Sequence, residues 1–263
     1  MGNLADKSEI LYHVGFCADD LKGAEWAVLP GDPGRVQLLA ENLGEAKFIA
    51  CHREYTSWLA QMDCGPVLVC STGMGGPSTA ICLEELARMG IKGVIRVGTT
   101  GTIQKKINIG DLIINNAAVR LDGTSQHYAP LNFPAVADID ITNALRQAAV
   151  ENDFPCHTGI SVSTDTFWPG QERYDSFSGY VRKSLRGTLQ EWQKLGALNY
   201  EMETSALFVV SQCLGLKAGA VCSVVAKRTD SEAVVPLGNK GETARRFMVT
   251  VKRALQLLLK AGE

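Results

Sequence analysis

Short apolar runs alternate along this chain with longer stretches whose apolar residues recur every three or four positions. The short runs predict β-strands, because apolar runs bounded by glycine or polar turns are typical of buried strands. The longer stretches predict amphipathic helices. The expected strands cover residues 25–29, 67–71, 94–97, 111–119, 158–164 and 218–226, and the expected helices cover residues 36–43, 78–89, 141–149, 189–195, 201–214 and 242–259.

This alternation predicts an α/β fold in which a central mixed β-sheet is flanked by helices. Residues 120–138 and 228–241 are polar and irregular, so we expect long connections there. The chain shows no repeat with a fixed period, and no linker rich in Pro, Gly or Ser divides it. We therefore expect a single domain over residues 1–263.

One predicted strand contains a charged residue. Residues 94–101 read VIRVGTTG, so Arg96 lies inside an otherwise apolar run. A buried guanidinium is costly unless it is paired. The strand alone leaves two interpretations equally open: Arg96 pairs with a carboxylate of the core, or it lies at the edge of a pocket and binds an anion. In the second case, hydroxyl and backbone N–H groups of Thr99, Thr100 and Gly101 would complete the anion site.

Two other strand ends run into glycine-rich turns. Residues 30–35 read PGDPGR and place Arg35 beside a helix start, where an exposed helix arginine is the simpler interpretation. Residues 71–78 read STGMGGPS, which matches neither a P-loop nor a dinucleotide-binding fingerprint. These glycines either expose backbone N–H groups to an anion before a helix or allow a tight turn. Ligands of open α/β sheets bind beyond the carboxyl ends of the strands, which makes both turns candidate binding elements.

Three polar clusters add candidate binding groups. Residues 51–55, CHREY, set Arg53 beside a glutamate, which alone indicates a surface ion pair. Residues 167–174, FWPGQERY, carry rings that can pack on a flat heterocycle, with Gln and Arg at its edge, or that can fill the core. Residues 199–204, NYEMET, place two glutamates at a helix start, where the dipole favours carboxylates. Glu201 and Glu203 are two positions apart, so one can cap the helix while the other faces a pocket and holds sugar hydroxyls.

Composition narrows the class of protein. Of 263 residues, 46% are hydrophobic and 21% are charged, and 26 basic against 28 acidic residues give a net charge of −2. This balance gives no overall positive charge that would attract nucleic acid or an anionic membrane. No apolar run approaches the ~18 residues of a membrane span, and the N-terminus lacks a signal-peptide pattern, so we expect a cytoplasmic protein. The eight cysteines form no CxxC pair and the four histidines are separate, so we expect reduced core thiols and no zinc site.

Taken together, the motifs resemble those of the nucleoside phosphorylase-I family, along nearly the whole chain from about residue 13 to the C-terminal helix. PGDPGR, HRE, STGMGGPST, RVGTTG, VRLDG, FPAVAD, DTFWPGQERYD and NYEMET occur in the family's order. One motif alone would be weak evidence, whereas all of them in register are specific, and FWPGQERYD is similar to the members that act on uridine. The resemblance implies the family's α/β fold and the phosphorolysis of uridine to uracil and ribose 1-phosphate, in pyrimidine nucleoside salvage and catabolism.

The resemblance also implies roles for individual residues. Those that would bind phosphate are Gly31, Arg35, Arg53, Arg96 and Thr99, with Arg53 reaching in from a neighbouring subunit. Those that would bind ribose are His13, Met202 and Glu203, with His13 again from a neighbour. Those that would bind uracil are Phe167, Gln171, Arg173 and Arg228. The catalytic step would depend on Arg96, Glu203 and Arg173.

Further implications concern assembly and ions. The family implies a homo-oligomer, a hexamer built from dimers with shared active sites. Glu54, Met74 and Ser78 match positions that bind a monovalent cation, K⁺, between subunits. Inorganic phosphate is the co-substrate, and no organic cofactor is implied. The chain departs from the family motifs at Trp168, where Tyr is frequent, and at Lys227, where Asn is common; Met74 replaces an aliphatic Ile.

Two alternatives remain open. A purine nucleoside phosphorylase of the same family would place an acid near the end of the last strand, where this chain has Val225, Ala226 and Lys227, and Asp230 follows too late. A non-catalytic nucleoside-binding protein on the same fold would be expected to lose a phosphate arginine or the ribose glutamate. Hydrolytic relatives need no phosphate cradle, which the three arginines at 35, 53 and 96 argue against.

Overall fold

The computed structural model describes residues 2–235 and 242–260, with side chains of the last helix described from residue 245. The strands are β1 (Trp26–Pro30), β2 (Glu45–His52), β3 (Tyr55–Met62), β4 (Gly65–Cys70), β5 (Gly93–Thr102), β6 (Leu112–Leu121), β7 (Ala135–Val136), β8 (Cys156–Thr164), β9 (Asn199–Glu201) and β10 (Lys217–Lys227). The helices are α1 (Val36–Leu43), α2 (Gly76–Arg88), α3 (Thr124–Tyr128), α4 (Ile139–Glu151), α5 (Thr188–Lys194), α6 (Thr204–Leu214) and α7 (Glu242–Lys260), with short 3-10 helices η1 (Ala18–Leu21), η2 (Pro33–Arg35) and η3 (Lys183–Leu185).

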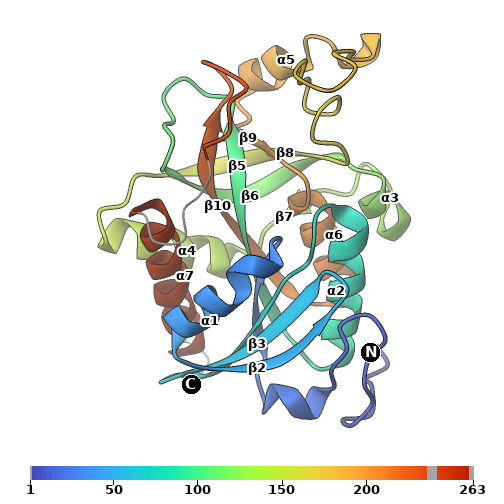
Figure 1. The fold of residues 1–263 in the computed structure, drawn as a ribbon, viewed down its shortest axis with the longest axis vertical. Coiled ribbons are helices and arrows are strands. Elements are labelled where there is room, and N and C mark those ends of the chain that lie inside the picture. The colour runs from blue at the N-terminus through green and yellow to red at the C-terminus, as the bar shows by residue number, and fades with distance from the viewer. Residues whose placement is uncertain (1, 236–241, 261–263) are drawn as a thin grey trace.

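These strands form one ten-stranded mixed sheet (Figure 1). β5 lies at its centre, parallel to β1 and β10 and antiparallel to β9. Because β10 also pairs with β6, β6 with β8, and β8 with β9, the five strands close into a ring. β1, β4, β3 and β2 extend the sheet outward from β5 in that order. The predicted fold class, a mixed β-sheet flanked by helices, is confirmed.

Helices cover both faces of the sheet (Figure 1). α1, α4 and α7 lie on one face, over a hydrophobic cluster that includes Val28 and Ile95. α2, α3 and α6 lie on the other, and a second cluster beneath α2 and α6 includes Ala27 and Val94. Side chains alternate along a strand, so neighbouring residues of β1 and β5 enter opposite clusters. Arg96 therefore shares the face of Val94 and points toward α2 and α6.

Three predictions of local structure are wrong. The structure has a hairpin of β2 and β3 that the sequence did not predict. β2 is an edge strand whose residues are exposed or half-buried, so it contains no apolar run. α3 and β7 lie inside residues 120–138, which were expected to be irregular; both are too short to show periodicity. The helix expected over residues 201–214 starts at Thr204, since β9 includes Glu201.

The remaining expected elements agree with the structure within a few residues at each end, except that β5 continues as a strand to Thr102, past the expected end at residue 97. The irregular segment 228–241 is described only as far as residue 235, and the single domain over residues 1–263 stays a prediction. All eight cysteines are free thiols, but only Cys70, Cys82 and Cys222 are buried, so the expectation of core thiols is wrong for the other five. Within the described residues, no helix has both the length and the apolar character of a membrane span.

Candidate active site

A cavity of about 530 Å³ opens at the carboxyl ends of β1, β5 and β10. This is the edge at which parallel strands bring their following loops together. The volume lies within the range of small-molecule sites. The predicted site residues that line it are Gly31, Arg35, Glu54, Met74, Arg96, Thr99, Phe167, Gln171, Arg173, Met202 and Glu203. Four others, His13, Arg53, Ser78 and Arg228, are not among the lining residues.

Arg96 forms the centre of the cavity's charged wall. Its side chain is 6% exposed; Nη2 donates a hydrogen bond to Glu203 Oε2, and Nε lies 3.5 Å from Glu201 Oε2. Burial disfavours the charged guanidinium, but the carboxylates of Glu203 and Glu201 hold the pKa of Arg96 above its ordinary value. The structure thus combines the two interpretations left open by the sequence, because Arg96 is paired with carboxylates and also lines the cavity.

The two glutamates next to Arg96 have different partners. Glu201 Oε2 accepts hydrogen bonds from the backbone N–H groups of Glu203 (2.8 Å) and Thr204 (2.7 Å), so it caps the start of α6. Glu203 instead accepts a bond from Gly75 N (2.7 Å) and from Arg96. Burial, with a smaller effect from the Glu201 charge, raises the pKa of Glu203, although Arg96 opposes the shift. Glu201 thus caps the helix, as predicted for one of the two glutamates, but both Glu201 and Glu203 line the cavity.

Two glycines make room for this arrangement. Gly75 has φ +90°, a backbone conformation that favours glycine, and in this conformation its N–H points at Glu203. A Cβ atom on Gly98 would lie 2.9 Å from Arg96 Nη2 and 3.1 Å from Arg96 Cζ. The glycine at position 98 therefore allows the Arg96 side chain to fold back along β5 toward Glu203.

Arg35 lies at the same end of the cavity, after β1. Asp32 caps η2 by accepting a bond from Gly34 N (2.8 Å), and Arg35 Nε lies 3.5 Å from Asp32 Oδ2. The Arg35 side chain is only 23% exposed, which makes it a guanidinium of the cavity wall rather than of an open helix surface. Thr99 and Thr100 both line the cavity, and the Thr100 hydroxyl also donates to Tyr200 O (2.6 Å) and so joins β5 to β9.

The other end of the cavity is aromatic. Phe167 lies on the segment after β8 together with Gln171, which lines the cavity and is buried. The Arg173 guanidinium carbon lies 4.3 Å from the centroid of the Phe167 ring. Such stacking holds the guanidinium in a defined plane. Trp168 packs edge-on against Phe167 and is half-exposed, so it supports the ring from outside.

Arg228 lies behind this aromatic end and supports it. Its Nη2 atom donates a bond to Gln171 O (3.0 Å), which ties the end of β10 to the segment after β8. Burial, followed by the charge of Arg228, lowers the pKa of Arg173, and Glu232 opposes this shift. Sequence reasoning missed Glu232; the only signal for it was an acid four positions after Arg228.

Comparison with known proteins agrees with this geometry. The family model described as "Phosphorylase superfamily" matches residues 25–261. The chain belongs to the phosphorylase superfamily. It is 46% identical over 252 residues to the uridine phosphorylase of Escherichia coli (strain K12), which covers 96% of this chain and 99% of that protein. Identity to the uridine phosphorylase of Haemophilus influenzae is 49% over 222 residues, covering 84% and 88%. Identity to the guanosine phosphorylase of Halorubrum lacusprofundi is 34% over 240 residues, covering 89% and 94%.

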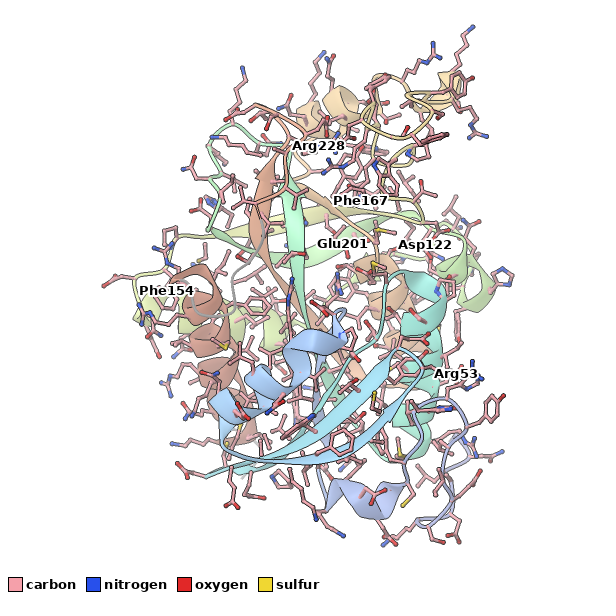
Figure 2. The ribbon with its side chains drawn as sticks, in the orientation of Figure 1. Arg53, Asp122, Phe154, Phe167, Glu201 and Arg228 are labelled. Atoms are coloured by element: carbon pink, nitrogen blue, oxygen red, sulfur yellow. The ribbon has the colours of Figure 1, made fainter. Side chains whose placement is uncertain are left out.

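Two predicted residues of this phosphorylase-superfamily chain lie on its surface, apart from the cavity. Arg53 is part of the turn between β2 and β3, with φ 54°, and its guanidinium bonds to the Tyr12 hydroxyl at 3.1 Å. His13 Nδ1 lies 2.6 Å from Oε1 of Glu85, which is buried in α2. Figure 2 shows Arg53 well away from Glu201, Phe167 and Arg228. Neither side chain is therefore part of the cavity of its own subunit.

The residues expected to bind a cation lie around the turn between β4 and α2. The Ser78 hydroxyl donates to Met74 O at 3.1 Å, and Glu54 lines the cavity next to Gly73. A carboxylate, a backbone carbonyl and a hydroxyl are hard oxygen donors, so this set fits a hard alkali cation. In the described part of the chain, no group of three or more His, Cys, Asp or Glu could hold a metal ion.

Proposed function

We propose that this protein is an enzyme that catalyses the phosphorolysis of uridine, giving uracil and ribose 1-phosphate. The observation that carries the proposal is one cavity with two different ends: Arg35 and Arg96 at the first, Phe167, Gln171 and Arg173 at the second. The first end suits a dianion and the second suits a flat base with polar edges. Relatives that are named uridine phosphorylase, at 46–49% identity over most of the chain, support this substrate.

In the proposed reaction, a phosphate oxygen forms a bond to C1′ of the ribose. The bond between C1′ and N1 of uracil breaks, and its electron pair leaves with the base. The sugar passes through an oxocarbenium-like state, which the phosphate dianion and the Glu203 carboxylate stabilise. Glu203, with Met202, holds the ribose hydroxyls. Arg173 stabilises the negative charge that develops on the departing uracil, and Gln171 binds the uracil edge.

The phosphate is held by positioning and charge. Gly31, Arg35, Arg96 and Thr99 surround it, and Arg96 is already oriented by two carboxylates before any substrate arrives. Orientation of this kind lowers the barrier, because the attacking oxygen is held close to C1′. Inorganic phosphate is the co-substrate, and the proposed step uses no organic cofactor.

A completed site requires a second subunit in this proposal. Arg53 and His13 would contact the phosphate and the ribose of a neighbouring subunit, since both lie on the surface outside their own cavity. We propose dimers with shared sites, assembled into a hexamer, with K⁺ held by Glu54, Met74 and Ser78 where subunits meet. A cytoplasmic location and an independence from nucleic acid and membranes stay predictions.

A purine nucleoside is the second candidate substrate, since one relative is named guanosine phosphorylase. The base end argues against it. Asp230, the acid closest to the end of β10, is exposed, accepts a bond from the Thr229 hydroxyl and is absent from the cavity wall. Arg173 and Gln171 occupy that wall instead.

The test is to incubate the purified protein with uridine, inosine and adenosine, each with and without phosphate, and to measure the release of free base. We expect uracil release from uridine that depends on phosphate. Release without phosphate would indicate a hydrolase, and a preference for inosine would indicate the purine alternative. Binding of uridine with no release of base would indicate the non-catalytic protein.

A further inference from the structure

Glu232 lies between the two arginines of the base end. Its Oε2 atom is 3.0 Å from Arg173 Nη1 and 2.5 Å from Arg228 Nε, and its Oε1 atom accepts a bond from Arg228 Nη2 at 3.0 Å. Its backbone carbonyl also accepts a bond from Arg173 Nη1 at 2.9 Å. A single residue thus contacts both guanidiniums through both carboxylate oxygens and its own carbonyl.

The two guanidiniums need such a partner. The side chains of Arg173 and Arg228 are 2% and 0% exposed, and like charges in a low-dielectric site repel strongly. Arg173 Nε, Arg228 Nε and Arg228 Nη1 are buried and form no hydrogen bond within the described structure, so the contact of Arg228 Nε with Glu232 is an ion pair. The carboxylate of Glu232 cancels one of the two positive charges, so the cluster carries a net charge of about +1.

The backbone places Glu232 there. Residues 230 and 231 donate their N–H groups to Lys227 O, at 2.9 and 3.1 Å, which turns the chain back after β10. Val235 N then bonds to Val225 O at 2.8 Å, and Val234 lines the cavity. Glu232 is in the turn between these two anchors, so its side chain is directed at the base end. The Glu232 side chain is itself 35% exposed.

We propose that Glu232 is a positioning residue that sets both the geometry and the charge of the base end. It holds Arg173 against Phe167 and leaves one net positive charge, which a departing base anion neutralises. This inference rests on the proposed function, because the anion in question is that of uracil. Glu232 acts through Arg173 and Arg228 and is not assigned a contact with the substrate.

The test compares Glu232→Gln, which keeps the shape and removes the charge, with Glu232→Asp, which keeps the charge. Asp230→Asn is the matched control, because it removes an exposed carboxylate from the same turn that contacts neither guanidinium. For Glu232→Gln we expect the KM for uridine and the Kd for uracil both to rise by about ten- to one-hundredfold. The reason is that Arg173 and Arg228 lose the charged hydrogen-bond partner that holds them in place. The KM for phosphate should change less than twofold.

Each outcome decides a separate point. Glu232→Asp should recover most of the affinity for uracil, and Asp230→Asn should match the unsubstituted enzyme. Equal KM values for uridine in Glu232→Gln and Asp230→Asn would overturn the role of Glu232. A rise in the KM for phosphate as large as the rise in the KM for uridine would also overturn it. So would a fall in Tm in both Glu232 variants large enough to explain the loss of uracil affinity, because either result would indicate a purely structural role. Failure of the unsubstituted protein to cleave uridine would instead overturn the proposed function.

Discussion

Arg96 and Glu203 form a buried ion pair at the point where the proposed phosphate and ribose sites meet. Removing two charges from water costs several kcal/mol, which such a pair recovers only with good geometry and additional hydrogen bonds. Glu203 has such a bond from Gly75 N, and the Glu201 carboxylate lies 3.5 Å from Arg96 Nε, within ion-pair distance. The pair is therefore in place before substrate binds, and a phosphate anion would meet an arginine that is already charged and oriented.

The raised pKa of Glu203 predicts how stability depends on pH. A carboxyl whose pKa is higher in the folded state binds a proton on folding, so its contribution to stability is present below the ordinary glutamate pKa and is lost as the pH rises through the raised value. Glu203→Gln cannot titrate. We expect its Tm to fall less than that of the unsubstituted protein across this window.

Thermal unfolding of both proteins from pH 4 to pH 8 measures the difference. Glu45→Gln is a suitable control, because this exposed glutamate lies on the edge strand β2. Parallel Tm curves for Glu203→Gln and the unsubstituted protein would show that Glu203 titrates alike in the folded and unfolded states, against the assigned burial.

At the level of single residues, the sequence predicted which role a side chain can take better than it predicted which residue that side chain contacts. Glu201 and Glu203 could be assigned to different tasks, because their spacing points them apart. Arg96 could not be assigned a partner, since Glu203 is 107 positions away along the chain. Glu232 was not found, because its importance arises from where the turn after β10 places it, and its four-residue spacing from Arg228 does not by itself mark that place.

At the scale of elements, β5 supplies both the sheet's centre and the cavity's charged wall. Alternation along the strand sends Val94 and Arg96 to the face of α2 and α6, while Ile95 and Val97 pack beneath the helices of the opposite face. The segment from Gly98 to Gly101 then lies at the cavity's edge. One strand thus anchors the core and positions a guanidinium, and its glycines determine how closely that guanidinium can approach the backbone.

Gly98→Ala should therefore damage the phosphate end while leaving the fold intact. Its Cβ atom would meet Arg96 Nη2 at 2.9 Å and Cys222 Sγ at 3.3 Å, and Arg96 cannot yield freely because Glu203 and Glu201 hold it. We expect the KM for phosphate to rise by about tenfold, since small displacements of a positioning group cost one to two orders of magnitude.

Steady-state kinetics with varied phosphate, beside circular dichroism, would measure this effect. Gly123→Ala is the matched control, because a Cβ atom there meets its nearest neighbour, Asp165 Oδ2, at an ordinary 3.5 Å. An unchanged KM for phosphate in Gly98→Ala would contradict the assignment of Arg96 to the phosphate site.

The elements that the sequence predicted are those that bury an apolar run or an apolar stripe. β1, β4, β5 and β10 were found because they are buried along most of their length. β2 was missed because it lies at the sheet's edge, with its side chains largely in solvent. The closure of the ring by β9 was also beyond prediction, since its pairing with both β8 and β5 joins strands that are far apart along the chain.

At the scale of the whole molecule, the proposed sharing of sites has a direct test. Arg53→Ala and Glu203→Ala should each be nearly inactive alone, because each lacks one group of every site. In mixed assemblies, one of two sites in a heterodimer would contain both native residues, so co-expression should restore about one quarter of the full activity if pairing is random.

Assays of the co-expressed variants, with sedimentation to establish assembly, would measure this restoration. Activity no greater than the sum of the two separate variants would place Arg53 outside a shared site. A fully active monomer in sedimentation would contradict the proposed oligomer in the same way.

The cavity's two ends are built from different parts of the chain. Arg35 comes from η2 after β1 and Arg96 from within β5, whereas the base end comes from the segment after β8 and the turn after β10. Arg228 and Glu232 tie the two base-end segments to each other. The bonds and ion pairs that these two residues form in the described structure do not involve Arg35 or Arg96. To redirect the protein to another nucleobase, residues 165–173 and 228–235 would have to be exchanged together, as one unit. The residues proposed to bind phosphate could be kept unchanged.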